Sequence, residues 1–222
     1  MTFSIAARCA RTGQFGAAVA SSSPSVAARC AHARAGIGAV MTQNVTDPRL
    51  GPQGLDLLTL GASAGEAARI LHTTAPHAEH RQVALVDAAG RVAGFSGARC
   101  LGVHALAETT DAIAAGNLLA SDGVPRAMLA AFAADGPLGE RLLSALRAGL
   151  AAGGEAGPVR SAGLLVVDRV AWPVADLRVD WHDDPIGELT LLWAVWQPQM
   201  AAYVARALAP DAAPAYGVPG ES

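Results

Sequence analysis

Residues 2–23 read TFSIAARCARTGQFGAAVASSS, and this stretch decides the fold class. Side chains alternate along Thr2–Arg8 between an apolar face and a mostly polar one, as is typical of a β-strand with one buried face. Arg11–Gln14 form a turn, and the chain resumes at Phe15 as a strand of small side chains. We therefore expect an N-terminal hairpin, with its second strand pressed between two layers.

The rest of the chain adds strands in pairs and helices in blocks. A third strand is expected over residues 34–44, and Ser63 and Glu66 form the S-x-x-E pattern that begins a helix. The later strands are expected as a hairpin over 80–97 that turns at 87–90, a strand near 108–114, and two strands over 161–168 and 176–181. The later helices are expected from Pro125, over 137–152, and from Pro185 to Trp196. Hairpins exclude a parallel doubly wound sheet, and helices in blocks favour an α+β sandwich.

Length and composition fit one domain. The chain has 222 residues, of which 52% are hydrophobic and 16% charged, so it has ample material for a core. We expect a single domain over residues 1–208 and a disordered tail over residues 209–222, where the pattern of strands and helices stops.

Charge excludes several classes of function. The net charge is −3 and no basic cluster is present, which argues against a nucleic-acid partner. All 16 basic residues are Arg, so a Schiff-base lysine, a pyridoxal phosphate anchor and a Walker P-loop are excluded.

The three cysteines are far apart and predict neither a zinc site nor a disulfide framework. No leader or membrane span is recognisable, so a cytoplasmic protein without a cofactor is expected.

Several segments together resemble a known family. They are TFSIAAR, TGQFGAAVASSS, ARAGIGAVMTQN, LGPQGLDLL, EHRQVALVDAAGRVAGFSG, AAGNLL and DLRVDWHDDPIGEL, in order between residue 2 and about residue 192. The chain is similar in these segments to the domain-of-unknown-function family 1028, which is associated with the N-terminal-nucleophile (Ntn) hydrolase fold. The resemblance implies a four-layer α-β-β-α sandwich with two antiparallel sheets, and hydrolysis of an amide bond in a small molecule. The chain departs from the family at Cys9–Arg11, where an Asp-Pro usually precedes the turn.

Thr2 is the candidate nucleophile. If Met1 is removed, which a small second residue permits, Thr2 carries a hydroxyl and a free amine on one residue. A free α-amine has a pKa of about 7.7–8.0, so part of it is a neutral base at physiological pH. If Met1 is retained, that nitrogen belongs to a peptide bond and cannot act as the base. Thr2 would then be an ordinary first residue of a strand.

Other polar residues could complete this site. Asn117, after the flexible Gly116, is the candidate donor to the oxyanion, although it could equally satisfy a turn. Glu79 and Arg81 have a second interpretation as a solvated ion pair. The candidate substrate-binding residues are Arg8, Ser22, Thr42, Gln43, His80, Arg81 and Gln82.

Three further patterns carry weaker hypotheses. Residues 94–98, GFSGA, nearly match the G-x-S-x-G nucleophile motif, but they end a hairpin strand without a following helix. His72, His77 and His80 near Glu79 lack the spacing of a metal site. Asp180, His182, Asp183 and Asp184 could hold a metal, but Asp184 is explained as an N-cap and the cluster as the entry to a helix, so no metal is expected.

The alternative to the hydrolase hypothesis is a non-catalytic module that binds a small molecule or peptide on the same sandwich. Both hypotheses are compatible with self-association. A homo-oligomer is expected because the helix with Trp193 and Trp196 offers more apolar surface than a terminal helix needs.

Overall fold

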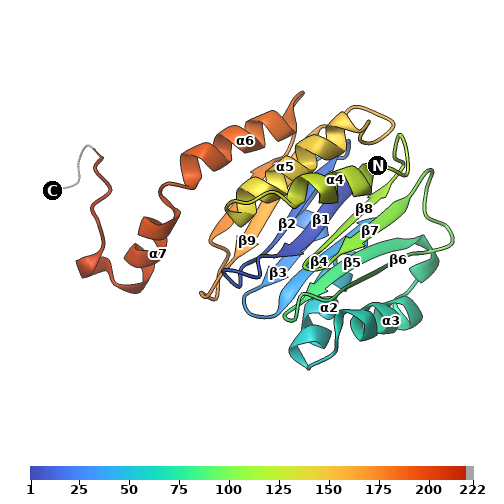
Figure 1. The fold of residues 1–222 in the computed structure, drawn as a ribbon, viewed down its shortest axis with the longest axis horizontal. Coiled ribbons are helices and arrows are strands. Elements are labelled where there is room, and N and C mark those ends of the chain that lie inside the picture. The colour runs from blue at the N-terminus through green and yellow to red at the C-terminus, as the bar shows by residue number, and fades with distance from the viewer. Residues whose placement is uncertain (219–222) are drawn as a thin grey trace.

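The N-terminal hairpin lies at the centre of a six-stranded antiparallel sheet. In the computed structural model, which describes residues 1–218, Ile5 of the first strand pairs with Ala18 of the second. The strand order is β10-β9-β2-β1-β8-β7 (Figure 1). The strands are β1 (Thr2–Arg8), β2 (Phe15–Ser21), β7 (Ala105–Thr109), β8 (Ala112–Asn117), β9 (Ser161–Val167) and β10 (Ala175–Val179).

A second antiparallel sheet packs face to face against the first. Its order is β3-β4-β5-β6. Its strands are β3 (Ala31–Arg34), β4 (Gly38–Asn44), β5 (Arg81–Asp87) and β6 (Val92–Ser96). The predicted third strand and second hairpin therefore belong to this sheet, and Asp87–Gly90 makes the turn between β5 and β6.

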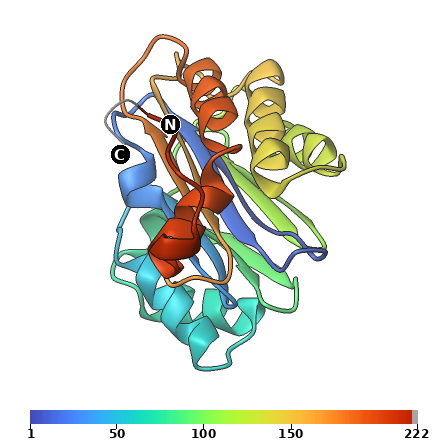
Figure 2. The ribbon, with the colours of Figure 1, turned by 90° about the vertical axis from the view of Figure 1, so that its left-hand side faces the viewer.

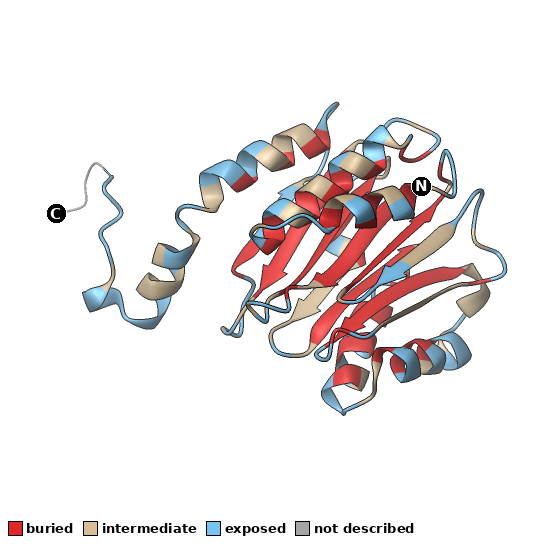
Figure 3. Ribbon diagram, in the orientation of Figure 1, coloured by how far each residue is buried: buried red, intermediate tan, exposed pale blue. Residues whose placement is uncertain are grey.

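Helices cover the outer face of each sheet, so the fold is the expected α+β sandwich (Figures 1 and 2). The six-stranded sheet is covered by α4 (Val124–Phe132), α5 (Leu138–Ala151) and α6 (Pro185–Trp196). The four-stranded sheet is covered by α2 (Leu50–Thr59) and α3 (Ala64–Thr74). Buried side chains form one core beneath each helix layer and a third core between the sheets (Figure 3).

Local chemistry explains where two of these helices begin. Ser63 caps α3, because its hydroxyl accepts from the Glu66 N–H while the Glu66 carboxylate accepts from the Ser63 N–H. Asp184 caps α6 by accepting from the Gly187 N–H, and Pro185 occupies the first helical position. Both helices were predicted from these residues.

Other elements differ from the prediction. The single strand expected near 108–114 is the β7–β8 hairpin, which turns at Thr110–Asp111 with Asp111 in the left-handed region at a φ of 68°. The short α1 (Ala27–Cys30) and β3 fill the predicted loop before β4. A 3₁₀ turn (Ala78–His80) precedes β5.

The C-terminal segment adds a helix that the sequence did not predict. After Pro198, α7 (Met200–Leu208) lies beyond the edge of the sheets (Figure 1). A 3₁₀ turn follows at Pro210–Ala212, and Arg206 then donates to the carbonyl oxygens of Pro214 and Ala215. Residues 219–222 of the predicted tail lie outside the described residues, so disorder of the tail stays a prediction. Among the described residues, no helix has the length and apolar character needed to cross a membrane.

Candidate functional site

Thr2 is the first residue of β1 and points into the space between the sheets. Its partner on β8 is Asn117, and residues directly opposite each other share one face of a sheet. Ala6 and Ala115 are placed on that face by the alternation along their strands, and both belong to the core between the sheets. The Thr2 side chain therefore faces the four-stranded sheet beside Asn117, and Thr2 is 6% exposed.

Two hydroxyl groups hold the carbonyl oxygen of Met1. Thr2 Oγ1 donates to this oxygen at 2.5 Å, and Ser21 Oγ, at the end of β2, donates to the same oxygen. The two hydroxyl oxygens are 3.3 Å apart. Met1 itself is 36% exposed, whereas Thr2 is 6% exposed.

A buried chain of amide groups runs beside Thr2. The Ser4 hydroxyl donates to Gln43 Oε1 at 2.6 Å, and Gln43 Nε2 donates to Gln82 Oε1 at 2.7 Å. Asn117 Nδ2 donates to the same Gln82 oxygen at 3.3 Å, and Gln82 Nε2 donates to the Gly116 carbonyl at 2.9 Å. The hydrogen bond to Gln82 Oε1 directs Asn117 Nδ2 toward that oxygen. Asn117 Oδ1 has no hydrogen-bond partner among the described residues.

A buried carboxylate, Glu155, lies beside the N-terminus. Glu155 is 4% exposed and forms a β-bridge with Leu119, just beyond Asn117. Burial raises the pKa of Glu155 to about 7, although the α-amine of the chain and the hydroxyl and N–H of Ser22 oppose that rise. Neither carboxylate oxygen accepts a hydrogen bond of standard geometry from the described residues.

Of the predicted site residues, the structure brings Thr2, Asn117, Gln43, Gln82 and Ser22 to one end of the sandwich. The first four face the space between the sheets, and Ser22 directly follows the end of β2.

The other predicted residues lie elsewhere. Arg8 lies at the far end of β1, roughly 20 Å from Thr2, and pairs with Asp111 at 2.8 Å. Thr42 and Arg81 alternate with inward-facing residues and so lie on the outer face of their sheet. Thr42 donates to the Asp47 carbonyl, and Arg81 donates to the Val45 carbonyl. His80 ends the 3₁₀ turn before β5.

The weaker sequence patterns gain no support from the geometry. Ser96 of GFSGA ends β6 and accepts from Gln82 Nε2 at 2.9 Å, with no helix following it. Glu79 Oε1 lies 3.7 Å from the nearest ring nitrogen of His80 and 4.0 Å from that of His77. Within residues 1–218, no three His, Cys, Asp or Glu side chains lie together in a way that could hold a metal ion.

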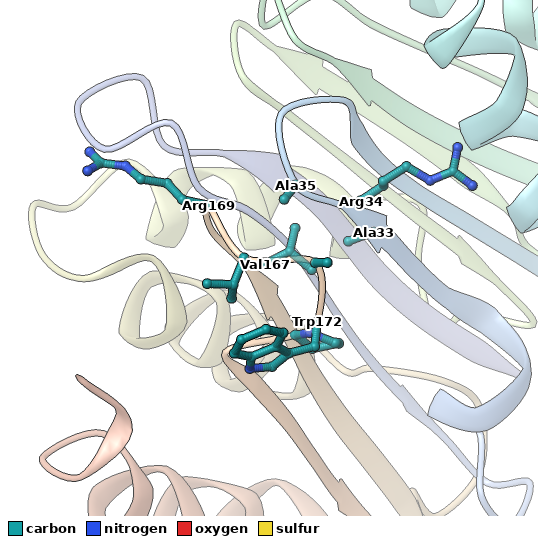
Figure 4. Close-up of a pocket in the computed structure, with 9 residues that line it drawn as sticks. Ala33, Arg34, Ala35, Val167, Arg169 and Trp172 are labelled. Atoms are coloured by element: carbon teal, nitrogen blue, oxygen red, sulfur yellow. The ribbon is translucent and has the colours of Figure 1, made fainter. Parts of the chain in front are cut away.

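An open cavity lies at the opposite end of the sandwich from Thr2. Figure 4 shows this cavity, which has a volume of about 510 Å³ and is lined by Trp172 and Val167. Val167 pairs with Phe15, at the end of β2 away from Ser21. The guanidinium groups of Arg34 and Arg169 point away from the cavity, and Arg34 pairs with Asp56 instead. Arg34 and Arg169 are among the residues that line the cavity, but their guanidinium groups do not converge on it.

Sequence reasoning missed Ser21 and Glu155. Ser21 could have been found, because the register of the N-terminal hairpin places it opposite Thr2. Glu155 could not, because a loop brings it back to the N-terminus.

Comparison with known proteins identifies the family. The model of DUF1028, described as a family of unknown function, matches residues 2–189. The chain belongs to the DUF1028 family. A similar solved structure is protein SPO2555 from Silicibacter pomeroyi, assigned to DUF1028, with 31% sequence identity and a TM-score of 0.81 over 87% of this chain and 88% of that chain.

A second solved structure is more distant. It is Anbu (ancestral beta-subunit) from Yersinia bercovieri, with 14% identity and a TM-score of 0.40 over 92% of this chain and 97% of that chain. That score is too low to support an argument about this DUF1028 chain. No curated protein matches the chain.

Proposed function

We propose that this DUF1028 protein is an Ntn-type hydrolase that cleaves an amide bond of a small molecule after Met1 is removed. The observation that carries the proposal is the position of Thr2, whose hydroxyl lies inside the sandwich opposite Asn117 and 3.3 Å from the Ser21 hydroxyl. A threonine at the start of a strand usually does not require buried polar groups around its hydroxyl. Here the hydroxyl, a second hydroxyl and an amide donor converge where the chain begins.

In the proposed reaction, the Thr2 amine is the base and Thr2 Oγ1 the nucleophile. The amine takes the hydroxyl proton as Oγ1 bonds to the substrate carbonyl carbon, and the carbonyl electron pair moves onto oxygen. When the C–N bond breaks, this proton passes from the amine to the leaving nitrogen. Water then cleaves the ester, releasing the acid and returning a proton to Oγ1.

Asn117 is suited to stabilise the oxyanion. Its Nδ2 has two hydrogens, of which one is directed at Gln82; Asn117 is buried here, so the proposal requires that removal of Met1 opens a path to the second. The amide chain through Gln82 and Gln43 holds this donor in a fixed orientation, which spares the reaction the cost of reorganising it. We propose that substrate contacts come from this end of the sandwich, including Ser22.

Intact-mass measurement and a hydroxyl-directed electrophile test the proposal. Protein lacking Met1 should form a covalent adduct with a β-lactone at residue 2, found by peptide mapping. Thr2→Ala should abolish the adduct, while Thr109→Ala, an exposed position on β7, should leave it unchanged. Absence of an adduct on protein shown to lack Met1 would refute the proposal. Libraries of amides and cyclic imides should then yield the substrate class.

A second function, binding without catalysis, is favoured by one observation. The Met1 carbonyl oxygen accepts hydrogen bonds from both the Thr2 and the Ser21 hydroxyl groups. Protein that retains Met1 has no free amine on Thr2 and cannot act by this mechanism. Retention of Met1 in protein purified from its natural host would therefore support the binding module.

A further inference from the structure

Glu155 is held beside the N-terminus by backbone pairing. The Ala120 N–H donates to the Gly154 carbonyl at 3.0 Å, and the Ala156 N–H donates to the Leu118 carbonyl at 2.9 Å. Residues 154–156 thus pair with the segment that continues β8 beyond Asn117. Because Asn117 is opposite Thr2, this pairing fixes the Glu155 carboxylate near the start of β1.

Among the described residues, the α-amine of the chain is a cation that acts on the Glu155 carboxylate. Ser22 adds a hydroxyl and an N–H, which carry no charge. The α-amine also acts on the buried Cys30 thiol, whose pKa is raised by burial. A carboxylate that is 4% exposed and lacks hydrogen bonds of standard geometry is costly unless a charge balances it.

We propose that Glu155 is the counter-ion of the α-amine and the acceptor of its proton. The inference rests on the proposed function for its role in the reaction, but the pairing itself does not require catalysis. Removing Met1 moves the amine by one residue, about 3.8 Å, to Thr2 at the start of β1.

The proposed step moves one proton. The step starts from the charged pair, an ammonium group at the N-terminus and a carboxylate at Glu155. When a substrate excludes water, separated charges become more costly than a neutral pair, so the proton passes from the ammonium nitrogen to a Glu155 oxygen. The net charge of the pair stays zero, and the amine becomes the neutral base that Thr2 Oγ1 needs. Glu155 is therefore a positioning residue that acts through the amine.

The absence of Lys makes this inference directly measurable. The α-amine is the one primary amine in the sequence, so reductive methylation with formaldehyde and cyanoborohydride modifies a single site. Only the neutral amine reacts. An opposite charge nearby favours the charged form of a group, so under this proposal Glu155→Gln should speed labelling at pH 7. Glu140→Gln, an exposed carboxylate on α5, is the matched control and should not change the rate.

Equal labelling rates in folded wild-type and Glu155→Gln protein would overturn the inference. If this variant does not fold, the test is made on the wild-type chain. Acetylation of the α-amine removes its positive charge and should raise the pKa of Glu155 further above about 7, as measured by NMR of the carboxyl group. An unchanged value would also overturn it.

The same variants separate this inference from the proposed function. Failure of Met1-free wild-type protein to form the β-lactone adduct refutes the hydrolase, whatever the labelling rates show. If the adduct forms, Glu155→Gln should shift the acid limb of its pH–rate profile, whereas a purely structural role would lower the rate equally at every pH.

Discussion

Glu155→Gln should change how stability depends on pH. Burial raises the pKa of Glu155 from 4.5 to about 7 in the folded protein that retains Met1. At about 1.4 kcal/mol per pKa unit, this difference corresponds to about 3 kcal/mol. Below pH 4.5 the carboxyl is protonated in both states and carries no penalty. Between pH 4.5 and 7 the unfolded chain releases the proton while the folded chain keeps it, so stability falls as pH rises. Above pH 7 the full penalty is present.

Urea unfolding at pH 4.5, 6 and 8 measures this effect. Gln cannot ionise, so its cost of burial is the same at each pH. The free energy of unfolding of Glu155→Gln, relative to wild type, should therefore rise by about 3 kcal/mol between pH 4.5 and 8. Glu140→Gln should run parallel to wild type, because its side chain is exposed in both states. Parallel curves for Glu155→Gln and wild type would show that Glu155 is solvated, and would refute the reasoning.

Three further predictions test the packing, the amide chain and self-association. A methyl group at Gly139 would overlap the Trp193 ring, so Gly139→Ala should lower the free energy of unfolding by about 1–3 kcal/mol. Gly65 lies in open space on α3, so Gly65→Ala should instead raise the free energy of unfolding by about 0.5–1 kcal/mol. Gln82→Leu leaves two buried amide donors without their acceptor and should cost about 2–4 kcal/mol in urea unfolding; a cost under about 1 kcal/mol would contradict the assigned network. Val195 is 66% exposed on α6, so in the predicted homo-oligomer Val195→Asp should give a smaller species in sedimentation velocity, and a monomeric wild type would exclude that oligomer.

The fold was predictable where local chemistry and burial point the same way. The alternation along Thr2–Arg8 and the turn after it define the central hairpin, and the capping residues of α3 define its start. The β7–β8 turn was not predictable, because Asp111 takes a left-handed conformation without the usual Gly and is held by an ion pair with Arg8. Tertiary contacts, which no local pattern encodes, decided that turn.

Tertiary packing also determines which surface is available for the self-association that we expect. The sequence pointed to Trp193 and Trp196, but Trp193 is buried against α5 and Trp196 donates to the Val174 carbonyl at 2.9 Å. The exposed apolar residues of α6 are instead Leu191, Leu192 and Val195. Residue type alone predicted an apolar helix, but the packing decides which of its side chains remain exposed.

The core between the sheets gives the strongest physical reason to place function at the Thr2 end. Along β1 this core changes from apolar at Ala6 to polar at Ser4 and Thr2, and the facing strands change with it, from Met41 to Gln43. A sandwich gains stability from apolar side chains there, since each buried polar group must find a partner or cost about 1–3 kcal/mol. Packing does not require an amide chain, two hydroxyls and a buried carboxylate around the first residue of the chain. A group of costly residues gathered at one end of an otherwise apolar core supports the proposal that a binding or catalytic site lies there.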